Sequence, residues 1–148
     1  MEGRERPRAC IFARNMSIWA LPGFSCRDRA AVLVIYLENG AEKQLVACSA
    51  YLPYDSEDPP PSRELEELVL YCEKENLHLV VGCDSNAHHV AWGSTNCNDR
   101  GEALMEFLNS SNLEIFNRGT ESTFCSGTRQ VVIDTLGSFG LLESITGW

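Results

Sequence analysis

Strand-length apolar runs constrain the fold of this chain more than any other feature of its sequence. Each run has five to nine residues and almost no charge, a pattern typical of strands covered on both faces. The runs are ACIFA at 9–13, AAVLVIYL at 30–37, QLVACSAYL at 44–52 and LHLVVGC at 77–83. The turn signal ENG at 38–40 predicts that the second and third runs pair as a hairpin.

Two segments have the spacing of helices that bury one face. The first runs from Ser62, a suitable cap, to about Asn76. Its apolar face is made by Leu65, Leu68, Val69 and Cys72. The second begins at Asp99, where DRGE fits a capping box with Glu102. Its inner face is made by Leu104, Phe107, Leu108 and Ser111.

Short strands are expected after the second helix, at LEIF, STF and VVID within 113–139. Strands and helices then alternate along the chain, with a hairpin near its start. This order predicts a layered α/β fold with a mixed sheet. The length of 148 residues corresponds to about one domain, covering 1–148.

Composition narrows the class of protein. The net charge of −9 argues against a protein that simply coats nucleic acid, but an enzyme can use acidic groups to hold a divalent metal against a phosphate. The apolar runs are too short to span a membrane, and we find no secretory signal. Seven cysteines, an odd number without a C-x-x-C pair and mostly inside apolar runs, predict reduced, buried thiols in an intracellular protein.

Polar residues follow the apolar run 77–83 at once, in the stretch VVGCDSNAHHVAWGS. Ligands of open α/β sheets gather beyond the carboxyl ends of strands. If the strand geometry continues, Asp84 and Asn86 point the same way and can hold a hydrated divalent cation. The alternative is that both residues merely build a turn.

Two further residues are candidates for a functional site, and a third possibility is a zinc site. Tyr51 ends the third predicted strand, in SAYLPYD, and its hydroxyl can donate to a phosphate oxygen; otherwise it is an interior tyrosine with a satisfied hydroxyl. Asp134 lies in VVIDTLGS, where a partly buried carboxylate usually serves as a cap, an ion-pair partner or the orienter of a histidine. A zinc site made by Cys83, His88, His89 and Cys97 is disfavoured, because their spacing matches no standard ligand pattern.

Taken together, these motifs resemble the endonuclease domain of jockey-type non-LTR retrotransposons, within the endonuclease/exonuclease/phosphatase (DNase I-like, exonuclease III-like) superfamily. The resemblance covers about residues 9–148 and rests on SAYLPYD, GCDSNAHHVAWGSTN, LEIFNRGTESTF and VIDTLGS. It implies a four-layer α/β sandwich of two packed mixed sheets flanked by helices. It also implies a Mg²⁺- or Mn²⁺-dependent phosphodiesterase that acts on DNA, in a polyprotein with a reverse transcriptase. We expect an intracellular protein, with the nucleus as the candidate location.

The resemblance implies a role for each matching residue. Asp84 matches the catalytic Asp that positions or deprotonates the attacking water, and Asn86 matches a hydrogen-bond donor at the scissile phosphate. Tyr51 matches a phosphate-contacting Tyr, and Asp134 matches the Asp that orients the catalytic His. Asp84 and Asn86 are also the expected metal ligands.

Two parts of the family pattern have no match in this sequence. The metal-binding Glu is expected upstream of RACIFARN, and the catalytic His of an S-D-H motif is expected after LLESITGW. His78, His88 and His89 do not lie in that motif. We therefore expect a domain that is incomplete at both termini and a poor nuclease by itself. The alternatives are a catalytically dead remnant or non-enzymatic fragment, and a phosphatase of the same fold.

Overall fold

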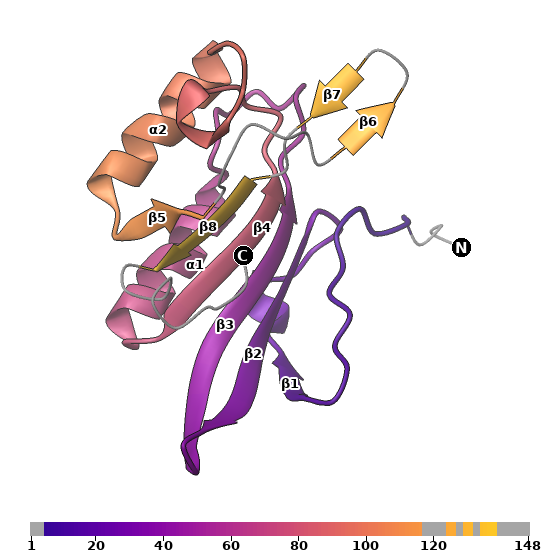
Figure 1. The fold of residues 1–148 in the computed structure, drawn as a ribbon. Helices are drawn as coiled ribbons and strands as arrows, with labels where there is room; N and C mark the ends of the chain where they lie inside the picture. The colour runs from indigo at the N-terminus through magenta and orange to yellow at the C-terminus, as the bar shows by residue number, and fades with distance from the viewer. Residues whose placement is uncertain (1–4, 117–123, 127–128, 132–133, 139–148) are drawn as a thin grey trace.

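A six-stranded mixed sheet forms the centre of the protein (Figure 1). The computed structural model describes residues 5–116, 124–126, 129–131 and 134–138 of the chain. The sheet has the order β1-β2-β3-β4-β8-β5. These strands are β1 (Ser17–Ala20), β2 (Arg29–Glu38), β3 (Ala41–Tyr51), β4 (His78–Asp84), β8 (Asp134–Ser138) and β5 (Leu113–Ile115). A separate hairpin pairs β6 (Phe124–Ser126) with β7 (Arg129–Val131).

Strand direction explains why the sheet is mixed. β1, β2 and β3 are antiparallel neighbours, β3 and β4 are parallel, and β8 is antiparallel to both β4 and β5. The β2–β3 hairpin turns at Asn39 and Gly40, which both have positive φ, as a two-residue turn of this type requires. The predicted hairpin and mixed sheet are confirmed.

Two helices cover one face of the sheet. α1 (Arg63–Lys74) is capped by the Ser62 side chain, which accepts from the N–H of Leu65 at 3.3 Å. α2 (Asp99–Ser110) is capped by Asn98, so the predicted cap at Asp99 is wrong by one residue. Both helices share one core cluster with β3 and β4. The cluster includes Leu65, Leu68, Leu104, Leu108, Val46, Val81 and Trp92.

The opposite face of the sheet is less covered. Along β4, buried residues alternate with half-exposed or exposed ones, and β3 alternates in the same way over its second half. The prediction that these strands are covered on both faces is therefore only partly correct, because one face is buried and the other is mostly half-buried. The four-layer arrangement remains a prediction, since the described residues form one large sheet with helices on one face.

The predicted strand at 9–13 is also wrong. That segment is irregular, and the edge of the sheet is instead formed by β1. Phe12 is 90% exposed, so the apolar character of this segment does not bury it. No helix among the described residues is long and apolar enough to cross a bilayer.

The cysteines only partly follow the expectation of buried thiols. Cys48, Cys72 and Cys83 are buried, whereas Cys10, Cys26 and Cys97 are exposed. Burial raises the pKa of the Cys48 thiol to about 12 and that of Cys72 to about 11. These two thiols stay protonated at neutral pH and serve as small core residues.

Candidate functional site at the ends of β3 and β4

The carboxyl ends of β3 and β4 lie side by side, because the two strands are parallel neighbours. Tyr51, the last residue of β3, is directly opposite Asp84, the last residue of β4. One step further, the N–H of Leu52 donates to the carbonyl of Asp84 at 2.9 Å. The sheet register thus brings two of the predicted site residues to one edge.

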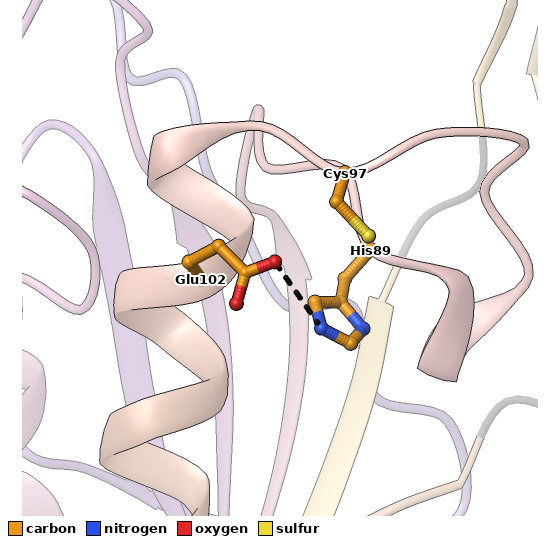
Figure 2. Close-up of side chains that lie close together, drawn as sticks. All are labelled: His89, Cys97 and Glu102. Carbon is orange, nitrogen blue, oxygen red and sulfur yellow. Dashed lines mark ion pairs between the residues drawn. The ribbon is translucent and has the colours of Figure 1, made fainter.

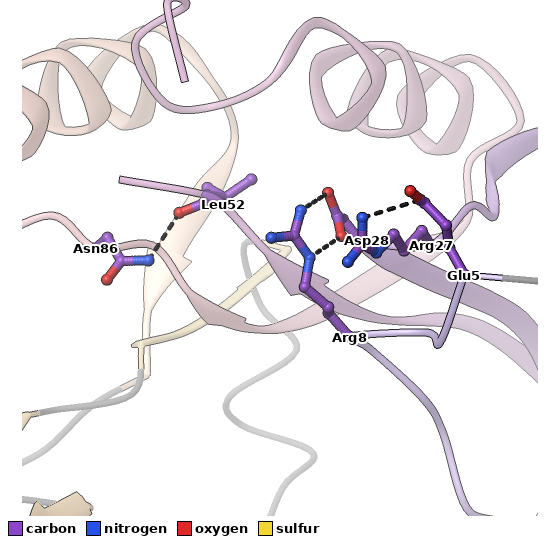
Figure 3. Close-up of polar contacts among 6 residues, drawn as sticks. All are labelled: Glu5, Arg8, Arg27, Asp28, Leu52 and Asn86. Atoms are coloured by element: carbon purple, nitrogen blue, oxygen red, sulfur yellow. Dashed lines mark hydrogen bonds and ion pairs between the residues drawn. The ribbon is translucent and has the colours of Figure 1, made fainter. Parts of the chain in front are cut away.

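Asn86 reaches this edge by a route that strand geometry does not predict. β4 ends at Asp84, and Asn86 has a left-handed φ of 49°, so the expected extended continuation is wrong. The Nδ2 of Asn86 donates to the carbonyl of Leu52 at 2.9 Å (Figure 3). Its backbone N–H donates to Oδ1 of Asp84 at 3.4 Å. Asparagine tolerates this backbone conformation better than most residues, and the hydrogen bonds hold it there.

Arg100 is a member of this site that the sequence analysis did not predict. It lies in the first turn of α2, and its Nε donates to the carbonyl of Asn86 at 3.1 Å. Its Nη2 donates to the carbonyls of Ser85 at 2.9 Å and Leu52 at 3.4 Å. Burial lowers the pKa of the Arg100 guanidinium, and its interaction with Tyr51 acts in the opposite direction. The guanidinium therefore ties the ends of β3 and β4 together and carries positive charge close to Tyr51.

One signal in the sequence points to Arg100. The first turn of a helix favours acidic groups, because the helix dipole is positive there, and an arginine at this position opposes that preference. The DRGE segment was interpreted only as a cap. A cation in the first helical turn, shortly after a polar strand end, indicates that the guanidinium has partners outside its own helix.

Tyr51 is flanked by a second arginine. The central guanidinium carbon of Arg8 lies 4.7 Å from the centroid of the Tyr51 ring. Arg8 also donates from Nε and Nη2 to the two carboxylate oxygens of Asp28 (Figure 3). The hydrogen-bonded Arg8 guanidinium lowers the pKa of the Asp28 carboxyl. Much of the Arg8 charge is therefore balanced locally, whereas Arg100 bonds only to neutral carbonyls among the described residues.

Asp134 is the first residue of β8 and pairs with Cys83 in the antiparallel ladder with β4. Its backbone is therefore close to that of Asp84, at the same end of the sheet as Tyr51. The Asp134 side chain lies outside the described residues, so its predicted role remains a prediction. The backbone register agrees with a shared site, because it brings the three strand ends together.

The oxygen atoms at this edge suit a hard divalent cation. Asp84 is half-buried, and its carboxylate forms no ion pair with the described residues. Asn86 uses its amide nitrogen on Leu52, which leaves Oδ1 as the atom for a ligand. Carboxylate and amide oxygens are ligands that Mg²⁺ and Mn²⁺ accept. The residues present thus fit the metal that the family pattern implies.

A neighbouring hollow is a poorer candidate for binding phosphate. Its volume is about 330 Å³, and Tyr51 and Leu52 form part of its wall. Asp28, Asp58 and Glu64 also line it, whereas Asp84 and Asn86 do not. These three carboxylates outnumber the one arginine of the lining, Arg29, and oppose the entry of an anionic backbone. We therefore place the candidate site at the edge that carries Asp84, Asn86 and Arg100.

The disfavoured zinc grouping separates in the structure. Cys83 is buried in the core at 1% exposure. His89 and Cys97 do approach each other, but their third neighbour is Glu102. Trp92 packs in the loop at 1% exposure, with Nε1 donating to the carbonyl of Ala87 at 3.3 Å.

Comparison with known proteins identifies the family of this chain. Residues 45–139 match the model of a family described as endonuclease-reverse transcriptase. This match covers most of the chain, and the chain belongs to that family, which confirms the resemblance to the DNase I-like endonucleases. The matched range includes Tyr51, Asp84, Asn86, Arg100 and Asp134.

A solved structure extends the likeness to the fold. The chain is similar to the endonuclease domain of TRAS1, a telomere-specific non-LTR retrotransposon, with a TM-score of 0.71 and 25% sequence identity. The alignment covers 93% of this chain and 63% of the solved chain. The protein thus spans less than two thirds of the length of that domain. No curated protein matches the sequence.

Proposed function

We propose that this chain provides a divalent-metal-dependent DNA endonuclease domain whose parent protein also carries a reverse transcriptase. The nick would leave a 3′-hydroxyl that primes reverse transcription of a retrotransposon at nuclear DNA. The observation that carries the proposal is the placement of Asp84 opposite Tyr51, with Asn86 and Arg100 at the same strand ends. We further propose that the whole domain is a four-layer sandwich.

In this proposal, Asp84 and Asn86 hold Mg²⁺ or Mn²⁺ through their side-chain oxygens. The bound ion would supply Lewis-acid stabilisation of charge on the phosphate. Asp84 orients the attacking water and accepts its proton. The Tyr51 hydroxyl and the second N–H of the Asn86 amide donate to phosphate oxygens, which stabilises the charge that develops there. Asp134 orients the acid–base histidine of the parent domain.

Arg100 explains how an acidic protein can accept a polyanion at this edge. The chain has a net charge of −9, so its overall field repels DNA. The Arg100 guanidinium is bonded to three neutral carbonyls, so its positive charge is not cancelled by these bonds. It lies close enough to Tyr51 to interact with it electrostatically. A local positive charge next to the donors favours a phosphodiester.

The test is nicking of supercoiled plasmid with Mg²⁺ or Mn²⁺ by the 148-residue protein, Asp84→Asn and the control Asp55→Asn. Asp55 is exposed in the loop after β3. We expect slow, metal-dependent nicking that falls by about 10²–10⁴-fold in Asp84→Asn, because the proton acceptor is lost. The Asp55→Asn control should nick plasmid at the same rate as the unsubstituted 148-residue protein.

Equal nicking by Asp84→Asn would contradict the assignment of the site. A chain that binds DNA and never cuts it, under conditions in which a longer product of the same gene nicks, would instead favour the non-enzymatic alternative. Release of phosphate from a monoester without cleavage of DNA would favour the phosphatase alternative. The first outcome thus tests the site, and the other two separate the proposed nuclease from its two alternatives.

A further inference from the structure

Three potential metal ligands meet between the loop after β4 and the first turn of α2 (Figure 2). They are His89, Cys97 and Glu102, and their ligand atoms all lie within 4.8 Å of one another. The His89 ring is held against Trp92, with the ring centroids 5.1 Å apart. Its side chain is 16% exposed, whereas Cys97 and Glu102 face solvent. One ligand is thus fixed by packing, and the other two are free to adjust.

The spacing of these atoms suits a shared ion better than a direct contact. His89 Nε2 and Glu102 Oε1 are 3.8 Å apart, which is too long for a hydrogen bond. With zinc bonds of about 2.0–2.3 Å in a tetrahedron, two ligand atoms lie about 3.3–3.6 Å apart. The cluster therefore needs only a small inward shift, which rotation of the exposed Cys97 and Glu102 side chains supplies.

We propose that His89, Cys97 and Glu102 form a zinc site that ties the loop after β4 to α2. One nitrogen, one sulfur and one carboxylate oxygen are the ligand types that Zn²⁺ accepts, with water as the fourth ligand. Mg²⁺ prefers oxygen and does not suit thiolate. This site is separate from the edge with Asp84 and Asn86, and it does not depend on the proposed endonuclease activity.

The tautomer of His89 gives the proposal a specific signature. Without metal, Nδ1 accepts from the backbone N–H of Ala91 at 3.0 Å, so the proton of a neutral imidazole is on Nε2. Zinc binding at Nε2 moves that proton to Nδ1, which breaks the bond from Ala91. The Cys97 thiol gives its proton to solvent when it becomes a thiolate. Binding thus releases one proton per zinc and changes the environment of the Ala91 amide.

The consequence for the fold is a clamp on the loop that follows Asn86. This loop is already fastened to α2 by Asn98, whose Oδ1 accepts from the N–H groups of His88 at 2.9 Å and Gly101 at 2.8 Å. A zinc ion bound to His89 and Glu102 would add a second link between the same two segments. We expect the metal to reduce local opening of residues 87–98.

The experiment titrates the reduced 148-residue protein with Zn²⁺ against a chromophoric chelator. The ligand variants are Cys97→Ser and Glu102→Gln. The matched controls are Cys26→Ser, another exposed thiol, and Glu106→Gln, one turn further along α2. We expect one equivalent of zinc, bound at least about tenfold more weakly by each ligand variant and unchanged in the controls. The Co²⁺ form should show a thiolate charge-transfer band that is lost in Cys97→Ser.

Two further measurements on the same samples complete the test: the chemical shift of one amide and the number of protons released. The Ala91 amide resonance should shift on zinc binding, and calorimetry in buffers of different ionisation enthalpy should show release of one proton. Absence of stoichiometric binding would overturn the proposal. Equal affinity in either ligand variant, or equal weakening by Cys26→Ser, would also overturn it, because the ion would then lie elsewhere.

Discussion

Two asparagines adopt the same left-handed backbone conformation in different surroundings. Asn39 has a φ of 52° in the exposed β2–β3 turn, and Asn86 has a φ of 49° after β4. At Asn39 the turn itself explains the conformation, since two residues must reverse the chain between paired strands. At Asn86 the conformation is held by bonds to Leu52 and Arg100, which are distant in the sequence.

The difference separates a turn that only shapes the fold from a turn that builds a site. No side-chain hydrogen bond from the described part of the chain reaches the hairpin turn, and its tip faces solvent. The Asn86 turn places an amide, a carboxylate and a guanidinium at the end of two parallel strands. Strained backbone that is fixed by distant side chains is characteristic of functional sites. Substitutions in the two regions should therefore differ more in activity than in stability.

The largest expected difference comes from Asn86→Ala and Asn39→Ala. Both replacements put alanine in a left-handed conformation, which costs about 1–2 kcal/mol of folding free energy. Only Asn86→Ala also removes the donor that we propose for the phosphate, so we expect nicking to fall by a further ~10²–10³-fold. Plasmid nicking and chemical denaturation on both variants separate the two effects. Equal loss of nicking in both would remove the distinction between the turns.

Gly101→Ala tests how closely α2 packs on the loop. A Cβ at Gly101 would lie 1.9 Å from the carbonyl oxygen of His88, and that atom belongs to the backbone. We expect a loss of about 1–3 kcal/mol in the free energy of unfolding, despite the better helix propensity of alanine. Gly23→Ala is the control, because nothing lies within 4 Å of its Cβ position. If urea denaturation gave the two variants equal stability, the close approach of α2 to the loop would be wrong.

Arg100→Lys keeps the charge and removes the forked donor. Lysine cannot bond to the carbonyls of Leu52, Ser85 and Asn86 together. We therefore expect the free energy of unfolding to fall by about 1–2 kcal/mol, and nicking to be weaker. Arg63→Lys is the control, since its pair with Glu67 is exposed and contributes little. The NMR signal of the Asn86 side-chain amide should shift only in Arg100→Lys. An unchanged signal would show that Arg100 does not position Asn86.

The smallest effect concerns Asp28, at the end of the β2–β3 hairpin that adjoins the site. The pKa of its carboxyl is lowered by Arg8 from an ordinary value of 3.8. A lowered folded-state pKa gives stability that is present above the unfolded pKa and is lost as the pH falls through the folded pKa. The stability difference between the protein and Asp28→Asn should thus be constant near neutrality and shrink below pH 3.8. A difference independent of pH across this range would exclude the Arg8–Asp28 linkage.

The sequence predicts those parts of the fold whose causes are local. The apolar runs predict β2, β3 and β4, the ENG segment predicts the hairpin turn, and Ser62 predicts the start of α1. The run 9–13 is equally apolar, yet it forms no strand. A strand needs a partner, and the free edge of β2 pairs with Ser17–Ala20 instead. Tertiary contacts decide which segment pairs with that edge, and a local sequence pattern does not encode them.

The candidate site also has residues that the sequence predicts and residues that it does not. Tyr51 and Asp84 could be predicted, because both end apolar runs and parallel strands bring such ends together. The conformation of Asn86 could not, because it depends on Leu52 and on a helix that begins more than ten residues later. Arg100 was missed for the same reason, since its acceptors are backbone carbonyls that only the folded chain assembles. Contacts between distant segments therefore set the limit of the sequence analysis.

The most direct measurement of the central claim is Mn²⁺-induced broadening of the amide signals of the protein. The account predicts selective broadening at Tyr51, Leu52 and residues 84–87, no matching effect at the hairpin tip 38–41, and loss of the effect in Asp84→Asn. The ion then binds where the two parallel strands end, beside the donors that the proposed phosphodiester chemistry requires. Broadening spread over the acidic surface, or broadening that persists in Asp84→Asn, would contradict the assignment of this edge as the metal site.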